Sequence, residues 1–300
     1  MARMFIFGLG YTASRLAKYL RSKGWEVEGT GSREGRPFDD EKGVVAALEG
    51  VKYVLSSVPP DCTSGTDPVL ERYGAELSGQ AAARPWLGYL SSTGVYGDRQ
   101  GAWVDEGTPV GSGRRSARAE CDAAWLERGA RVFRLPGIYG PGRSALDRVC
   151  QGTAHRIDLP GQVFSRIHVD DIVSAIAAAI EADAPPSPYN IADNLPCSQN
   201  AVIEEACRLL GREPPPLQTL EQADLSPMAR GFYAENRRVA NGKAKRLLGW
   251  RPGYPTYVEG LRAILAASGT AGAGTDLARS ATAIPAKASS PPPTASGDQR

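Results

Sequence analysis

Two glycines close to the start of the chain constrain its fold more than any other feature. Residues 8–13 read Gly-Leu-Gly-Tyr-Thr-Ala, and they separate a short apolar run at 5–7 from a segment that ends at Gly24. Apolar side chains recur in that segment at i, i+3, i+4 and i+7, which indicates an amphipathic helix. One glycine allows a tight turn, and the other lets a phosphate approach the backbone at the helix N-terminus. The pattern predicts a dinucleotide-binding turn, and a tight turn without a ligand is the alternative.

Short apolar runs and helical periodicities alternate through the first half of the chain. We expect strands over 25–29, 53–55, 86–90 and 131–135, and helices over 69–82 and 117–128. Further on we expect a turn-rich loop over 137–142, a short strand over 189–191, and helices over 172–180, 202–210 and 257–266. This alternation predicts an α/β fold, a doubly wound parallel sheet covered on both faces by helices.

Composition excludes several classes of protein. Of 300 residues, 42% are hydrophobic and 23% are charged, which is ordinary for a globular protein. The net charge of +2 gives no basic footprint for nucleic acid or a membrane surface. No apolar run reaches the length of a membrane span, and the first strand leaves no room for a signal peptide. Five scattered cysteines without a Cys-x-x-Cys pair, and two isolated histidines, predict reduced thiols, no metal site and a cytoplasmic location.

The end of the second strand bears on cofactor preference. A carboxylate there would bind a ribose 2′-hydroxyl and favour NAD, but the sequence has Thr30, Gly31, Ser32 and Arg33. Arg33 can pair with a 2′-phosphate. We therefore expect NADP, with NAD as the second possibility, and a solvated loop arginine is the alternative interpretation.

Several motifs fall in the order and spacing of one known family. They are the glycine turn, Ser-Ser-Thr-Gly-Val-Tyr-Gly at 91–97, Tyr-Gly-Pro-Gly at 139–142, His-Val-Asp-Asp at 168–171 and Leu-Gly-Trp-Arg-Pro at 248–252. Over residues 3–267 the chain resembles the extended short-chain dehydrogenase/reductase superfamily, the NAD-dependent epimerase/dehydratase group. The resemblance implies a Rossmann sheet with a smaller C-terminal substrate-binding lobe.

The resemblance also implies a division of the chain. The dinucleotide-binding domain takes 1–140 and about 166–192, and the substrate-binding lobe takes about 141–165 and 193–267. Residues 268–300, rich in Ala, Gly, Ser, Thr and Pro, are predicted to be a disordered tail. We expect a homodimer through the helices near 67–83 and 114–128. The residues expected to bind the cofactor are Gly8, Gly10, Tyr11, Thr12, Ala13, Ser32, Arg33, Ser57, Pro136 and Ile138.

Two departures from the family pattern stand out. The usual Gly-x-x-Gly-x-x-Gly is Gly-x-Gly-x-x-Ala here, with Phe7 and Ala13 at the outer positions. The family's Tyr-x-x-x-Lys pair, which moves the proton, is missing, and Ser112 and Ser116 stand at its positions. Tyr19 does have a lysine four residues on, but it lies on the first helix, where the match is a coincidence.

The remaining candidates for catalysis are Ser92, Thr93 and Tyr139. Ser92 matches the family's catalytic serine or threonine and would stabilise charge on a substrate oxygen. Tyr139 is our first substitute proton donor and His168 the second, although packing for the tyrosine and helix capping around Asp170 or Asp171 are the simpler roles. The sequence favours an NAD(P)-dependent oxidoreductase or epimerase acting on a small polar carbonyl or hydroxyl compound, such as a sugar or sugar nucleotide. The alternative is a catalytically degenerate NADP(H)-binding regulator or scaffold.

Overall fold

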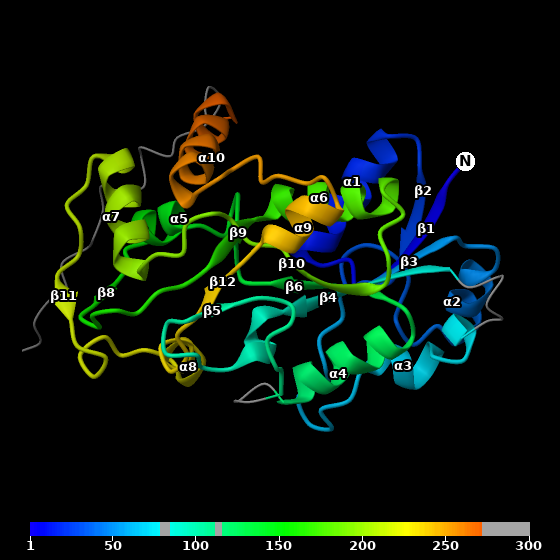
Figure 1. Cartoon of the computed structure of the whole chain (residues 1–300). Coiled ribbons are helices and arrows are strands. Elements are labelled where there is room, and N and C mark those ends of the chain that lie inside the picture. Colours follow the sequence, from blue (N-terminus) through cyan, green and yellow to red (C-terminus); the bar gives the residue numbers. More distant parts are fainter. Residues whose placement is uncertain (79–84, 112–115, 272–300) are drawn as a thin grey trace, which may run out of the picture.

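Six parallel strands form the centre of the structure, a computed structural model that describes residues 1–78, 85–111 and 116–271 (Figure 1). Their order across the sheet is β10-β6-β4-β3-β1-β2. The strands are β1 (Arg3–Phe7), β2 (Glu26–Gly29), β3 (Tyr53–Ser56), β4 (Trp86–Ser92), β6 (Arg131–Leu135) and β10 (Ser187–Asn190). The chain runs from β1 to β2 on one side and returns to β3 on the other. Ligands bind at such a switch point, outside the carboxyl ends of the strands.

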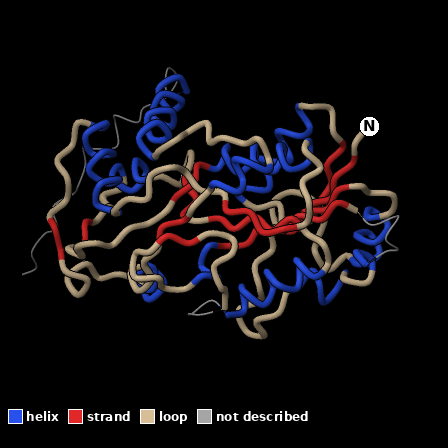
Figure 2. The backbone as a smooth tube through the Cα atoms, in the orientation of Figure 1, coloured by secondary structure: helices blue, strands red, loops and turns tan. Residues whose placement is uncertain are grey.

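Helices cover both faces of this sheet (Figure 2). Successive side chains of β1 point to opposite faces: Met4 and Ile6 join one apolar cluster, and Phe5 and Phe7 join another. On the first face lie α1 (Tyr11–Ser22) and α6 (Val169–Glu181), and on the second lie α2 (Glu41–Leu48), α3 (Pro68–Tyr73) and α4 (Ser116–Glu127). The predicted doubly wound α/β fold is confirmed.

A smaller lobe lies beside one end of the sheet (Figure 1). Its apolar cluster joins α5 (Ala145–Cys150), α7 (Gln199–Leu210) and α10 (Tyr257–Ala271). Three strand pairs accompany it: β7 (Gly137–Tyr139) with β9 (Arg166–His168), β8 (Arg156–Ile157) with β11 (Leu217–Gln218), and β5 (Trp103–Val104) with β12 (Arg238–Val239). The remaining helices are α8 (Pro227–Phe232) and α9 (Gly242–Leu247), with 3-10 turns η1 (Glu76–Ser78) and η3 (Thr93–Tyr96).

Three sequence-based expectations are wrong in their boundaries. The helix predicted over 69–82 ends at Tyr73, and after Gly74 only a 3-10 turn follows before residues 79–84, which lie outside the described residues. The loop predicted over 137–142 begins as β7, because β9 lies alongside and supplies its backbone partners. Residues 268–271, assigned to the tail, continue α10, and the rest of the predicted tail lies outside the described residues.

No helix in the described ranges has both the length and the apolar character needed to cross a bilayer. The apolar stripe of α4 turns inward. Trp125 is fully buried and stacks on Tyr89 of β4 at 5.3 Å between ring centroids, and its indole N–H donates to Asp67 at 2.8 Å. Trp125 is therefore a core residue.

Candidate active site

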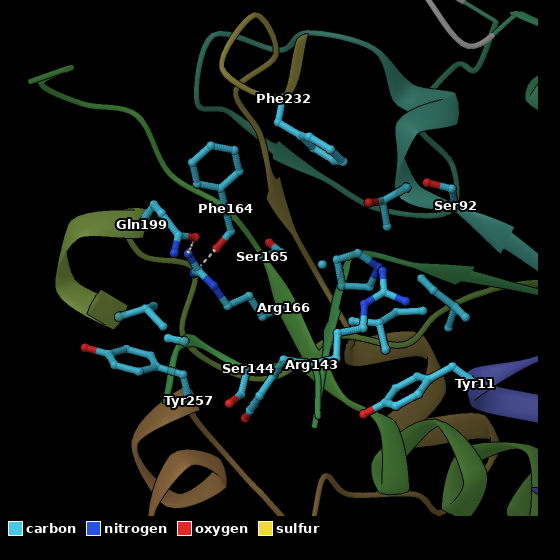
Figure 3. A pocket seen from close by; sticks show the side chains of 18 of the residues that line it. Tyr11, Ser92, Arg143, Ser144, Phe164, Ser165, Arg166, Gln199, Phe232 and Tyr257 are labelled. Atoms are coloured by element: carbon cyan, nitrogen blue, oxygen red, sulfur yellow. Dashed lines mark hydrogen bonds between the residues drawn. The ribbon is translucent and has the colours of Figure 1, made fainter. Parts of the chain in front are cut away.

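A cavity of about 800 Å³ opens where the sheet meets the smaller lobe (Figure 3). One wall is formed by the start of α1 and the carboxyl end of β4, and another by β7 and the residues before it. The smaller lobe closes the far end with residues of α5, β9, α7 and α10. The size is that of a typical small-molecule site. Of the residues predicted to bind a cofactor, Gly10, Tyr11, Thr12, Ser57, Pro136 and Ile138 line it.

The glycine turn is held rigidly between three strands. Gly8 has φ +83°, a left-handed conformation that favours glycine, and a Cβ there would lie 3.1 Å from the Ser57 hydroxyl. That hydroxyl donates to the Gly8 carbonyl at 2.5 Å, and the Gly8 N–H donates to Thr30 Oγ1 at 3.1 Å. Ser57 therefore supports the turn as well as lining the cavity.

Gly10 leaves the helix N-terminus open to a ligand. It precedes α1 in an extended conformation (φ −92°, ψ −163°), and no side chain caps the helix. No acidic residue lies in the first turn, and the nearest neighbour of a Cβ built on Gly10 would be the Gly8 carbonyl at 4.0 Å. Ala13 is buried where α1 packs on the sheet. The uncapped N–H groups and the free space fit the phosphates of a dinucleotide.

The end of β2 carries an exposed arginine. Ser32 and Arg33 are exposed and do not line the cavity. Arg33 has no ion pair within the described ranges, whereas the adjacent Glu34 pairs with Arg21 at 2.6 Å. The role of Arg33 toward a 2′-phosphate stays a prediction.

Ser92 and Thr93 lie at the cavity wall where β4 ends. The Ser92 hydroxyl accepts a hydrogen bond from the Gly94 N–H at 3.1 Å, the capping interaction that begins η3. A bond of this kind to the backbone is an ordinary structural role for a strand-end hydroxyl. Ser92 nevertheless lines the cavity, so both roles are compatible with its position.

A buried polar network fixes the end of β4. Asp122 of α4 is fully buried and accepts two bonds from the Arg134 guanidinium, at 2.7 and 3.0 Å, and one from the Ser91 hydroxyl at 2.7 Å. Arg134 also donates to the Tyr96 hydroxyl at 3.0 Å, which donates to Asn190 at 2.8 Å. The network ties α4, β4, β6 and β10 together directly behind Ser92. Sequence reasoning missed it, because its members are far apart in the chain.

Tyr139 packs inside the smaller lobe. Its hydroxyl donates to the Thr256 carbonyl at 3.4 Å and lies against Gly260, which has no room for a side chain. Burial raises the pKa of its hydroxyl above the ordinary value of 10.0. Although Tyr139 lines the cavity, this geometry favours the packing role over that of a proton donor.

His168 caps α6, where an aspartate was expected. Its Nδ1 accepts from the Asp170 N–H at 3.2 Å, and Asp171 instead accepts from the N–H groups of Gly253 at 2.6 Å and Tyr254 at 3.1 Å. The imidazole is nearly fully buried, and that burial lowers its pKa from 6.5 to about 4. A neutral imidazole that does not line the cavity is a poor substitute proton donor.

The positions of the absent Tyr-Lys pair are only partly described. Ser112 lies outside the described residues, and Ser116 is the exposed first residue of α4. Arg118, two residues on, lines the cavity and donates to the Tyr89 hydroxyl at 2.9 Å. Tyr19 lies on α1 and Lys23 follows its last residue; neither lines the cavity, and the lysine ammonium lies over the tyrosine ring.

Arg118 of α4 and residues of the smaller lobe give the cavity its charge, and sequence reasoning missed those of the smaller lobe. Five arginines and two carboxylates line it: Arg118, Arg143, Arg148, Arg166, Arg237, Asp147 and Glu235. Arg166 lies two residues before the His-Val-Asp-Asp motif, so its neighbourhood was visible in the sequence but its direction into the cavity was not. The site is electrostatically positive.

Curated proteins with similar sequences extend over most or part of this chain. No family model matches the chain. Protein YeeZ of Escherichia coli K12 is 29% identical over 291 residues, covering 85% of this chain and 97% of that protein. A 3-diazoavenalumate denitrifying reductase of Streptomyces sp is 34% identical over 145 residues, which cover 43% of this chain and 45% of that protein.

Solved structures match over almost their whole length. A conserved protein of unknown function from Silicibacter pomeroyi is 41% identical with a TM-score of 0.78, covering 89% of this chain and 99% of that chain. A Methylobacillus flagellatus protein assigned as an NAD-dependent epimerase/dehydratase is 26% identical with a TM-score of 0.68, covering 89% and 98%. The human epimerase family protein SDR39U1, solved with NADPH, shares the fold at 17% identity and a TM-score of 0.68, covering 87% and 98%. With its glycine turn and its parallel sheet, the chain is similar to a protein of the NAD-dependent epimerase/dehydratase group and shares its fold with solved members of the extended short-chain dehydrogenase/reductase superfamily.

Proposed function

We propose that the protein is an NADP-dependent oxidoreductase or epimerase with an atypical active site, acting on a small polar carbonyl or hydroxyl compound. One observation carries the proposal. A single cavity joins the uncapped start of α1, the Ser92 hydroxyl at the end of β4 and the smaller lobe. A protein that only bound a dinucleotide would have little use for the smaller lobe.

The start of α1 and the turn before it would hold the cofactor. The fold-related SDR39U1 was solved with NADPH, and the open N–H groups of α1 suit a diphosphate. A bound nicotinamide dinucleotide supplies or accepts the hydride. Arg33 has no competing carboxylate partner within the described ranges, which supports NADP over NAD.

Ser92 would assist by donating to the substrate oxygen on which negative charge develops. Without the Tyr-Lys pair, proton transfer loses about 10²- to 10⁴-fold, which slows a reaction without abolishing it. The relative named as a reductase, 34% identical over 145 residues, supports net reduction as the direction. The substrate class is a carbonyl compound or its equivalent alcohol, and a sugar or sugar nucleotide is one form it can take.

The test is transfer of deuteride from C4-deuterated NADPH to a panel of carbonyl compounds and sugars, followed by mass spectrometry. We expect label in a product, and a loss of turnover of about 10²-fold or more in Ser92→Ala with cofactor affinity unchanged. Ser22→Ala, on the far end of α1, is the matched control and should keep full turnover. Equal turnover in wild type and Ser92→Ala would remove Ser92 from the mechanism.

A second candidate function is a catalytically degenerate regulator that binds NADP(H) and passes that state to a partner. The missing Tyr-Lys pair and the inward hydrogen bond of the Tyr139 hydroxyl favour it. Cofactor binding without label transfer to any compound of the panel would select this function. We also propose a homodimer through the helices near 67–83 and 114–128, and a cytoplasmic location. Sedimentation of the full chain tests whether it is a dimer.

A further inference from the structure

Arg148 is a cation without a counter-ion in the cavity wall. It lies on α5, is partly buried and lines the end of the cavity formed by the smaller lobe. Its guanidinium has no hydrogen bond or ion pair with any residue in the described ranges. Burial, and then the charge of Arg166, lower the pKa of Arg148. A charge withdrawn from water without a partner is costly, and a ligand of opposite charge would offset that cost.

Arg166 provides a second positive charge close by. It is 6% exposed and belongs to β9. Its guanidinium donates to the carbonyls of Phe164 at 2.9 Å and Cys197 at 3.2 Å, and to the side-chain oxygen of Gln199 at 3.1 Å (Figure 3). These acceptors are neutral, so they fix the guanidinium in place but leave its charge uncompensated.

The two carboxylates of the cavity are engaged elsewhere. Asp147 accepts from both the N–H and the hydroxyl of Ser144, the capping box that begins α5. Glu235 pairs with Arg237 at 2.8 Å. Within the described ranges, no carboxylate forms an ion pair with Arg148 or Arg166.

Aromatic rings form the walls around the two arginines. Phe164 and Tyr233 meet edge to face, with centroids 5.6 Å apart, and Phe232 and Tyr257 also line the cavity (Figure 3). Flat apolar walls next to a pair of cations suit a ligand with a planar body and an anionic end.

We propose that this end of the cavity binds an oxyanion, a carboxylate or a phosphate carried on a planar ring or conjugated body, with Arg148 as its main charge partner and Arg166 as the second. The inference rests on the proposed function, since this oxyanion is the handle that places the substrate's carbonyl near Ser92. The inference narrows the class of substrate to compact planar acids, as distinct from neutral sugars and from nucleoside diphosphates.

The test is calorimetric titration of the full chain with benzoate, phenyl phosphate and UDP, each with and without saturating NADPH. The first two probes share a ring and differ in their oxyanion, so they separate the carboxylate from the phosphate. Wild type is compared with Arg148→Gln and with Arg212→Gln. Arg212 is a matched control, an exposed arginine outside the cavity whose guanidinium donates to the Val149 carbonyl.

We expect benzoate or phenyl phosphate to bind wild type and Arg212→Gln alike, and Arg148→Gln about tenfold or more weakly. Ligand-free Arg148→Gln should unfold at a temperature no lower than wild type, because it loses an uncompensated charge and no protein contact. Equal binding to wild type and Arg148→Gln, no binding to wild type at millimolar concentration, or tighter binding of UDP than of both ring probes would overturn the inference. Failure of the proposed function shows separately, as absent NADPH binding in wild type.

Discussion

Replacing Asp122 by alanine tests the buried network behind the end of β4. The Asp122 side chain is 0% exposed and that of Arg134 is 3% exposed, and two hydrogen bonds join them. Alanine leaves the Arg134 guanidinium buried without a counter-ion, and breaking such a pair costs about 3–5 kcal/mol. For a chain of this size that free energy corresponds to a fall in Tm of about 10 °C.

The assay is urea and thermal unfolding of Asp122→Ala followed by circular dichroism. The matched control is Glu34→Ala, because Glu34 pairs with Arg21 at 2.6 Å while the two side chains are 45% and 43% exposed, and an exposed pair contributes about 1 kcal/mol or less. The double variant Asp122→Leu with Arg134→Met, which removes both charges, should recover most of the loss. A loss below about 1 kcal/mol in Asp122→Ala, or no recovery in the double variant, would refute the reasoning.

Two further predictions concern the cofactor and the pH dependence of stability. Arg33→Gln should weaken NADPH binding about 10- to 100-fold and leave NADH binding unchanged, as measured by nucleotide fluorescence, and an equal effect on both nucleotides would count against a 2′-phosphate contact. The pKa of His168 is lowered from 6.5 to about 4 by burial, so the unfolded chain takes up the proton first, and wild type loses stability as pH falls from 6.5 to 4. His168→Asn keeps an acceptor that can cap α6 but has no imidazole to protonate, so it lacks this loss. As the pH falls from 6.5 to 4, the unfolding free energy of the variant should therefore rise by about 3 kcal/mol relative to that of wild type. The carboxyls of Asp171 and Asp193, whose pKa values burial raises to about 6 and about 7, act in the opposite direction but are common to both proteins. If the unfolding free energies of wild type and His168→Asn differ by the same amount at pH 7 and at pH 4, the lowered pKa of His168 is contradicted.

Local periodicity was sufficient to predict the elements that build the sheet. The run before Gly8, the stripe of α1 and the stripe of α6 depend on neighbours within a few residues, so the sequence displays them directly. The glycine turn was also predictable, because strand, turn and helix follow one another without interruption.

Contacts between distant segments were not predictable in this way. β7 is a strand because β9 pairs with it, and His168 takes the cap because the carboxylate of Asp171 is bound by the backbone after Trp250. Similarly, nothing local indicates that Arg148 and Arg166, from two different elements, face one cavity. The chemistry of the smaller lobe therefore emerged only from the structure.

Gly10→Ala tests the central claim most directly, that the turn before α1 holds a dinucleotide against its backbone. The nearest atom to the added Cβ is the Gly8 carbonyl at 4.0 Å, and the extended backbone of Gly10 accepts alanine, so the variant should fold with an unchanged or slightly raised Tm. The methyl group would stand where a phosphate must approach, so calorimetric titration should show NADPH binding in wild type and a loss of about tenfold or more in the variant. Equal NADPH affinity in the two proteins, or no binding to wild type at millimolar nucleotide, would contradict the account.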